Sequence, residues 1–332
     1  MKHAWWKILA LVLLIAASAF ALHTPLTPAL VHVSPSRIAP GMVTIEATGH
    51  HTDFQPGMPT WIENDGQVVC AQHVEVIDGR HIRMQVAVPA GMRENLTDLV
   101  VGGLRYPGAF YTEGMGTGID PTPCSGEVMT VDTGFAFPNR SILYESIRNL
   151  HFHVPMWFSM IALMAISVWK SIQVLGRNSL DRDREAVAAV QVGLLFCGLG
   201  LLTGALWARA TWGAFWTNDV KLNGSAVTAL IYLAYLVLRG SVADPDKRAR
   251  LAAVYNIFAF VLLVMFLFVL PRLNAIDSLH PGNGGNSGFG DLDMDDRLRM
   301  VFYPAVAGWV LLGIWMYELH HRSRRVAETL ER

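Results

Sequence analysis

The stretch AVAAVQVGLLFCGLGLLTGALW, residues 186–207, contains no charged side chain and is long enough to cross a bilayer as a helix of about 20 residues. The rest of the chain has a similar character, because 52% of its 332 residues are apolar and only 16% are charged. A soluble domain has roughly a quarter of its residues charged. The mean hydropathy is +0.34, and the net charge of −1 gives no basic field for nucleic-acid binding. We therefore predict a multi-pass membrane protein.

Five further apolar stretches are predicted to span the membrane, at 5–22, 154–174, 225–239, 251–271 and 299–317. The stretch at 225–239 is long enough only if the turn before it is counted. The first stretch could instead be a cleaved signal peptide, because Lys2 and Lys7 precede its apolar core and Ala19-Phe20-Ala21 resembles a cleavage site. We favour an uncleaved helix, which completes a bundle of six spans.

Basic residues mark one side of the membrane. They gather in alternate connections and in the tail, at Arg177, Arg182 and Arg184, then at Arg239, Lys247, Arg248 and Arg250, and finally in 320–325. The positive-inside rule places these segments and both ends of the chain in the cytoplasm. The segment from 23 to 150 and the aromatic stretch at 211–224 then face outward across the cytoplasmic (inner) membrane of a bacterium, into the periplasm.

The exported region from 29 to 112 has a different pattern. IEATGHHTDF and HIRMQVAVPAGM alternate apolar and polar residues between Gly, Pro and Asn/Asp punctuation, which predicts short antiparallel strands. The order SPSRIAPG, TGHHTDF, VAVPAGM and DLVVGG resembles the immunoglobulin-like TIG (IPT) β-sandwich, whose members commonly serve as interaction or spacer modules. We therefore predict a mostly α-helical, six-span bundle with an inserted all-β, immunoglobulin-like domain outside the cytoplasm.

The predicted linker at 113–140 is rich in Gly, Pro and Thr. Cys70 in the β region and Cys124 in the linker lie where a disulfide is chemically permitted, and the sequence leaves their pairing open. Cys197 falls inside a span and is interpreted as a buried small residue. No CxxC motif occurs, so the chain carries no thiol-redox motif of that type and no c-type haem attachment site.

TWGAFWTNDVKLNG, residues 211–224, places Trp212, Phe215 and Trp216 within five positions between two apolar spans. Such rings either belong to the aromatic belt at the bilayer surface or form a platform for a flat apolar molecule. Two histidines fall in the neighbouring outward connections. His153 stands before Val-Pro at the predicted mouth of the second span, with His151 close by, and His280 lies in SLHPGN. An interfacial histidine is commonly a hydrogen-bonded surface residue, but two imidazoles beside an aromatic platform also suit an edge-on haem.

The aromatic stretch and the two histidine segments together point to one protein family. TGALWARATWGAFWTNDVKLNG is similar to the tryptophan-rich WWD signature of the CcmC/CcsA family, the haem-handling proteins of cytochrome c maturation, and RNLHFHVP and SLHPGN resemble that family's two histidine loops. The resemblance covers roughly 140–320. It implies that His153 and His280 are the axial ligands of the haem iron and that His151 is not. It also implies an aromatic platform and two basic partners for the haem propionates; the platform residues are Trp212, Gly213, Phe215, Trp216 and Asp219, and the basic residues are Arg148 and Lys221.

This chain departs from the family pattern in its loop. Phe215 and Asn218 stand where the family usually has tryptophan, and Lys221 replaces an arginine, which turns a bidentate fork into a point charge. The β region has no counterpart in short family members. We expect a non-enzymatic protein that holds haem b as transient cargo and delivers it to a haem chaperone of the CcmE type. The alternatives are a haem lyase that joins haem to apocytochrome thiols, and a membrane scaffold that binds no haem.

Further partners are expected. The chain has no GxxxxGK[ST] loop, so ATP dependence would need another chain, such as an ABC-type subunit. The predicted organisation is listed by residue: a first transmembrane helix or signal anchor at 1–22, the β domain at 29–112, the linker at 113–140, the haem-handling transmembrane domain at 141–320 with its WWD loop at 207–224, and a cytoplasmic tail at 321–332.

Overall fold

The computed structural model describes residues 4–113, 134–140, 142–177, 179–273, 278–280 and 294–330. The chain divides into two compact units. The helical unit combines residues 1–24 with 145–332, and the β unit comprises Pro25–Tyr144. Most of the predicted linker, including Cys124, and most of the Gly/Asp-rich loop before the sixth span lie outside the described residues.

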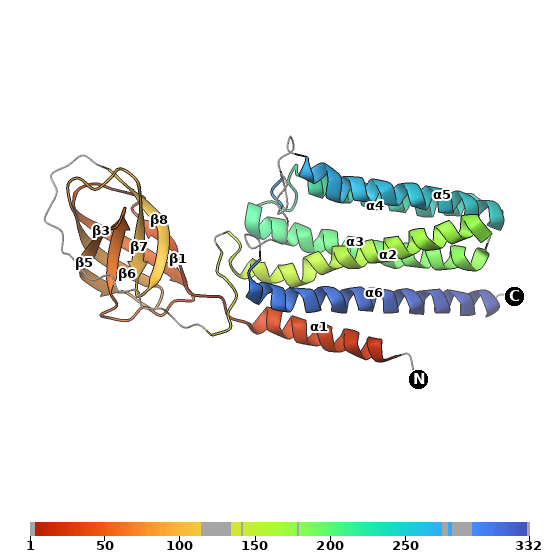
Figure 1. Cartoon of the computed structure of the whole chain (residues 1–332), viewed down its shortest axis with the longest axis horizontal. Helices are drawn as coiled ribbons and strands as arrows, with labels where there is room; N and C mark the ends of the chain where they lie inside the picture. Colours follow the sequence, from red (N-terminus) through yellow and green to blue (C-terminus); the bar gives the residue numbers. More distant parts are fainter. Residues whose placement is uncertain are drawn as a thin grey trace. The chain divides into compact units, whose positions relative to one another are not determined.

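Six helices in the described residues are long and apolar enough to cross a membrane, which confirms the predicted number of spans. They are α1 (Trp5–His23), α2 (Leu150–Arg177), α3 (Leu180–Trp212), α4 (Val220–Ser241), α5 (Pro245–Val264) and α6 (Asp296–Leu330), and they run side by side in Figure 1. The fifth span continues beyond α5 as a π-helical turn, η2 (Met265–Val269), and a 3-10 turn, η3 (Leu270–Arg272). The fourth helix, α4, includes the turn before residue 225, which makes it long enough to cross a bilayer.

The start of the second span differs from the prediction. The apolar pattern placed it near residue 154, but α2 begins at Leu150, directly after a 3-10 turn, η1 (Tyr144–Asn149). Arg148 in this turn donates hydrogen bonds to the carbonyl oxygens of Ala21 (2.9 Å) and Thr24 (2.6 Å), where α1 ends. These hydrogen bonds hold the turn against α1, and His153 lies on α2 itself.

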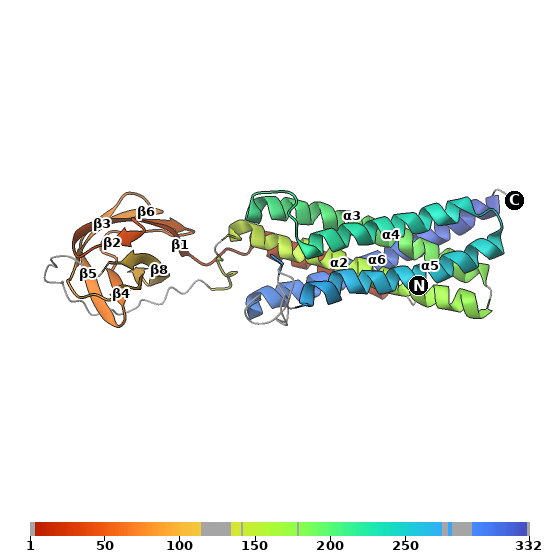
Figure 2. The ribbon, with the colours of Figure 1, turned by 90° about the horizontal axis from the view of Figure 1, so that it is seen from above.

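Small residues allow α3 to approach α2 closely, as is typical of helix contacts in membranes. A Cβ atom added at Gly193 would lie 2.8 Å from the Met164 side chain, and one added at Gly200 would lie 2.9 Å from the Trp157 ring. A similar contact joins α1 to α6, where a Cβ at Gly308 would lie 3.1 Å from Leu14. The helices therefore pack through glycine positions on several faces, and Figure 2 shows the bundle from a second direction.

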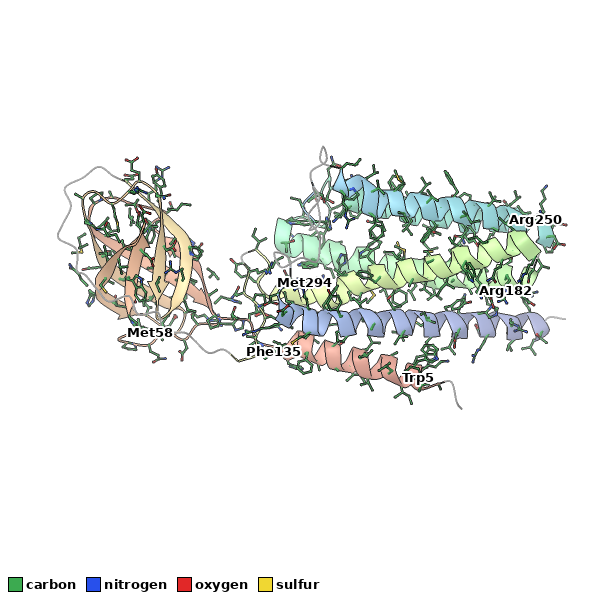
Figure 3. The ribbon with its side chains drawn as sticks, in the orientation of Figure 1. Trp5, Met58, Phe135, Arg182, Arg250 and Met294 are labelled. Carbon is green, nitrogen blue, oxygen red and sulfur yellow. The ribbon has the colours of Figure 1, made fainter. Side chains whose placement is uncertain are left out.

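Hydrogen-bonded polar side chains join the helices toward the end of the bundle where α3 begins and α4 ends. Asp183 at the start of α3 accepts two hydrogen bonds from Arg239 at the end of α4, at 2.5 and 2.7 Å. The buried Asn256 on α5 donates to the hydroxyls of Ser167 and Ser171 on α2, at 2.7 and 2.9 Å. Figure 3 shows that the labelled side chains Trp5, Arg182 and Arg250 lie at this end of the bundle, whereas Met294 lies at the opposite end. We call the Met294 end the site end.

The described part of the β unit contains eight strands in one sheet of order β1-β3-β6-β5-β4-β7-β8-β2. Its strands are β1 (Ala29–Ser34), β2 (Arg37–Ile38), β3 (Gly41–His50), β4 (Thr60–Asn64), β5 (Gln67–Val76), β6 (His81–Val88), β7 (Leu96–Val101) and β8 (Leu104–Thr112). The pairs are antiparallel except β2 with β8, and β1 also contacts β8, so the sheet is nearly closed around an apolar core. The predicted β domain is therefore confirmed, and its TIG identity stays a prediction. Cys70 on β5 is disulfide-bonded, and Cys197 on α3 is free and buried.

Candidate functional site

His153 lies in the first turn of α2, buried against α3. Its Nδ1 is 3.1 Å from the Thr203 hydroxyl oxygen. Two indole rings lie edge-on to the imidazole, with centroid separations of 6.3 Å to Trp157 on α2 and 5.8 Å to Trp207 on α3. The indole N–H of Trp207 donates to the Ser146 hydroxyl at 3.1 Å, which ties this wall to η1. The imidazole is thus enclosed by hydrogen-bonded and aromatic groups.

The absence of a side chain at residue 204 makes room for this imidazole. A Cβ atom added at Gly204 would lie 2.6 Å from Cε1 of His153 and 3.2 Å from Nδ1. Non-bonded carbon atoms do not pack closer than about 3.0 Å, so the imidazole would have to move if residue 204 had a side chain. The observed ring orientation therefore requires glycine.

His280 belongs to a short described segment, 278–280, between the fifth and sixth spans. Its Nδ1 is 3.0 Å from Oδ1 of Asp219 at the start of α4, and the backbone N–H of Leu279 donates to Oδ2 at 2.7 Å. The Trp212 ring at the end of α3 meets the imidazole edge-on, with centroids 5.1 Å apart. The structure therefore brings together the predicted residues His280, Trp212 and Asp219.

Asp219 combines two functions on one carboxylate. It is the N-cap of α4, where Oδ1 accepts from the backbone N–H groups of Lys221 (2.8 Å) and Leu222 (3.2 Å). It is also the partner of His280, and only 3% of the residue is exposed. Burial alone would raise the pKa of Asp219, but the hydrogen bonds from His280 and Ser278, the charge of His280 and the Leu279 N–H together lower it. The carboxyl therefore stays ionised and can hold the imidazole.

The loop between α3 and α4 presents its other rings outward. Gly213 ends α3 with φ of +77°, a left-handed conformation that glycine adopts without strain. Phe215 is 57% exposed and Trp216 is 45% exposed. The indole N–H of Trp216 donates to Asn223 (3.2 Å), which in turn donates to Asn218 (2.8 Å), so this ring is fixed by an amide chain.

The predicted basic residues occupy different surroundings. Arg148 uses Nη1 to hold the end of α1 and Nε to bind Glu145 at 2.7 Å, so part of its guanidinium has a structural role. Lys221 lies in the first turn of α4, beside Asp219. His151 is buried, with Nδ1 3.3 Å from the Arg148 carbonyl oxygen.

Sequence reasoning missed several neighbours of the two histidines. Thr203, Gly204, Trp157 and Trp207 surround His153, and Arg209 lies over the Phe215 ring at 5.8 Å and donates to the Gly213 carbonyl. A signal for two of them was available: Thr203 is a hydroxyl residue in an otherwise apolar span, and Gly200 and Gly204 form the small-xxx-small spacing of close helix contacts.

A cavity of about 370 Å³ lies between α4 and the η2–η3 segment, beside the loop that joins α3 to α4. It is lined by Asn218, Val220, Asn223, Gly224, Val227, Phe266 and Leu270. Neither His153 nor His280 lines it, so the cavity is separate from the paired imidazoles. The amide chain from Asn218 through Asn223 connects its wall to Trp216.

The fold and the site define a multi-pass membrane protein that carries two imidazoles among aromatic rings at one end of its helices. The family described as "Heme exporter protein C" (CcmC) matches residues 127–330, which include α2 to α6 and both histidines. The match extends over more than half of the chain. This protein therefore belongs to the CcmC heme exporter family, and strands β1 to β8 precede the matched region.

Individual relatives agree with this assignment. The chain is 29% identical over 208 residues to Heme exporter protein C of Paracoccus denitrificans, which covers 60% of this chain and 83% of the relative. It is 26% identical over 208 residues to the protein of the same name from Rhodobacter capsulatus, covering 60% and 81%. It is also 30% identical over 103 residues to the cytochrome c biogenesis protein CcsA of Prochlorococcus marinus, covering 31% and 32%.

Proposed function

We propose that this protein acts in cytochrome c biogenesis by binding haem b at the site end and delivering it to a haem chaperone of the CcmE type. Membership of the heme exporter family supports the haem-handling role. Haem supplies an iron that takes two axial nitrogen ligands and a flat macrocycle that stacks on aromatic rings. Haem is here a transient cargo, and the protein's own residues hold and release it.

The single observation that carries the proposal is the pair of oriented imidazoles. His153 is held by Thr203 and His280 by Asp219, in each case through Nδ1, and aromatic rings flank both. Metal-binding histidines typically make a hydrogen bond through the ring nitrogen that faces away from the metal. Both Nε2 atoms are therefore suited to bind the haem iron.

The surrounding residues have proposed roles toward the macrocycle. Trp212 supports His280, and Phe215 and Trp216 offer exposed ring surface for stacking, while Gly213 allows the loop to turn. Lys221 and Arg148 are the proposed propionate partners. Because Arg148 also anchors η1 to α1, its replacement should disturb the fold as well as the cargo.

An absorption spectrum of the 332-residue protein purified in detergent tests this function. We expect co-purified or added haemin to give low-spin bands of bis-histidine ligation. A stable complex with apocytochrome in place of a haem-loaded chaperone would favour the lyase alternative. A folded protein that retains no haem and gains none from added haemin would leave the scaffold alternative.

The proposed location is the bacterial inner membrane, with both chain ends in the cytoplasm and the β unit and site end on the periplasmic side. The basic residues at the opposite end of the helices support this orientation. The proposed partners are the haem chaperone and an ABC-type assembly that would provide ATP hydrolysis.

Deletion of residues 30–112 is expected to leave haem retention largely unchanged, because His153, His280 and the loop rings belong to the helical unit. The expected defect is in delivery, measured as haem transferred to the purified chaperone over time. A well-folded deletion variant that no longer retains haem would show that the β unit contributes to binding.

Trp216→Ala is expected to lower the haem-to-protein ratio about two- to ten-fold, because one aromatic contact contributes roughly 0.5–1.5 kcal/mol beyond burial. Trp216→Phe should lose less, since it keeps a ring for stacking. The matched control is Trp169→Ala, which removes an exposed indole on α2 away from the site. Equal ratios for Trp216→Ala and Trp169→Ala would assign Trp216 to the bilayer belt.

A further inference from the structure

We propose that Thr203 and Gly204 are positioning residues for His153: the hydroxyl fixes the tautomer of the imidazole, and the glycine provides the space for its orientation. Together they present Nε2 as the nitrogen with a free electron pair. This inference rests on the proposed function, in which His153 binds the haem iron. Neither residue touches the cargo in this assignment.

The direction of the hydrogen bond follows from the Thr203 hydroxyl, which has a single hydrogen. Its Oγ1 lies 2.8 Å from the carbonyl oxygen of Leu199, one helical turn earlier, and 3.2 Å from that of Gly200. Carbonyl oxygens only accept, so the hydroxyl donates its hydrogen to these carbonyl oxygens of α3. Toward His153 the same oxygen must then accept, and Nδ1 at 3.1 Å carries the hydrogen. In a neutral imidazole the other nitrogen, Nε2, then has the free pair that a metal requires.

The opposite arrangement is unfavourable. If Thr203 donated to Nδ1, the hydroxyl and the Leu199 carbonyl would place two oxygen atoms 2.8 Å apart with no hydrogen between them. Nδ1 would then hold the free pair, pointing into α3, and Nε2 would carry a hydrogen. The backbone of α3 therefore determines which nitrogen of a side chain on α2 is available.

Gly204 acts through shape. A methyl group at this position would lie 2.6 Å from Cε1 of His153 and 3.5 Å from Nε2, so the imidazole would have to move. Trp157 and Trp207 stand edge-on to the ring, and Trp207 is itself hydrogen-bonded to Ser146. The two indole rings therefore leave little room for the imidazole to reorient while keeping its contact with Thr203.

The two histidines thus have partners of different kinds. His280 is near the loop and pairs with a carboxylate, whereas His153 pairs with a neutral hydroxyl inside a membrane-spanning helix. A second buried carboxylate at residue 203 would be costly in that apolar setting. Threonine supplies the acceptor without a charge.

The hydroxyl is tested with Thr203→Val, which keeps the side-chain shape, and Thr203→Ser, which keeps the oxygen. Purified protein in detergent is titrated with haemin, and affinity and the low-spin fraction are measured. We expect Thr203→Val to bind about ten-fold more weakly or worse, as for the loss of other partners of metal-ligating histidines, and Thr203→Ser to restore most of the affinity. The matched control is Thr211→Val, on the same helix, whose hydroxyl donates to the Trp207 carbonyl oxygen at 2.9 Å.

The glycine is tested with Gly204→Ala. We expect a shift from low-spin to high-spin haem as the His153 ligand is lost, and recovery of the low-spin bands when free imidazole is added. Gly198→Ala is the matched control, because a Cβ there meets nothing within 4 Å. Imidazole rescue identifies a missing ligand, which a general loss of packing would not produce.

The outcomes separate the two levels of inference. If the unaltered protein binds haemin with bis-histidine bands while Thr203→Val and Gly204→Ala bind it with the same affinity and spectrum, the positioning role is wrong and the proposed function stands. If the unaltered protein binds no haemin, both are wrong. Should Gly204→Ala fail to fold, the comparison of Thr203→Val with Thr203→Ser still decides the positioning role.

Discussion

His153→Ala in the 332-residue protein is expected to reduce haem retention by about ten-fold or more, because it removes one of the two proposed axial ligands. His280→Ala should have a comparable effect. The remaining haem should lose its bis-histidine bands and show a single histidine ligand. The measurement is the haem-to-protein ratio and the absorption spectrum of purified protein, normalised to the folded fraction.

His151→Ala provides the matched control, since it removes a buried imidazole two residues away on the same helix. We expect it to retain haem with an unchanged spectrum. If His151→Ala loses the haem while His153→Ala keeps the bis-histidine bands, the assignment of the ligand on α2 is wrong.

Asp219→Ala is expected to have the second large effect, through two separable losses. Removal of the α4 N-cap should cost about 0.5–2 kcal/mol of stability, and removal of the partner of His280 should weaken haem binding about 10- to 100-fold. Asp219→Asn should recover most of the stability, because asparagine caps helices as well as aspartate does. It should still bind haem weakly, since a neutral amide is a poorer partner for the imidazole than a carboxylate.

Asp244→Ala distinguishes the two losses. Asp244 is the N-cap of α5 and accepts from the Lys247 N–H at 2.7 Å. Its replacement should lower the midpoint of thermal unfolding in detergent, as Asp219→Ala does, while haem affinity stays unchanged. If Asp219→Asn retained the full haem affinity, the carboxylate would have no role in orienting His280.

The sequence predicts the architecture well because each element carries its own pattern. Runs such as 186–207 lack charged side chains, and strands such as His81–Val88 alternate apolar and polar residues. Both the helical unit and the β unit can therefore be predicted from local sequence patterns. The start of α2 could not be predicted in this way. The preceding turn is held by hydrogen bonds from Arg148 to α1 carbonyl oxygens, a contact between segments far apart in the sequence that no local pattern indicates.

In the candidate site, too, some residues follow from local sequence patterns and others only from contacts between helices. His153, His280 and the loop rings are predicted from residue types and from the resemblance, and their roles toward haem remain predictions. Their neighbours depend on which faces of α2 and α3 meet, which no single helix specifies. Asp219 was interpreted as part of the aromatic platform, whereas its contacts are with His280 and the first turn of α4, a difference that only the folded chain makes visible.

The shared carboxylate of Asp219 links the helix start to the ligand thermodynamically. If His280 binds the cargo as proposed, whatever free energy the cargo gains by restraining this histidine also stabilises the first turn of α4, because both contacts use the same Oδ1 atom. Such coupling is reciprocal. In the proposed function, a partner protein that unwinds this turn would therefore loosen the cargo by the same coupling free energy, without having to contact the iron or displace the imidazole directly.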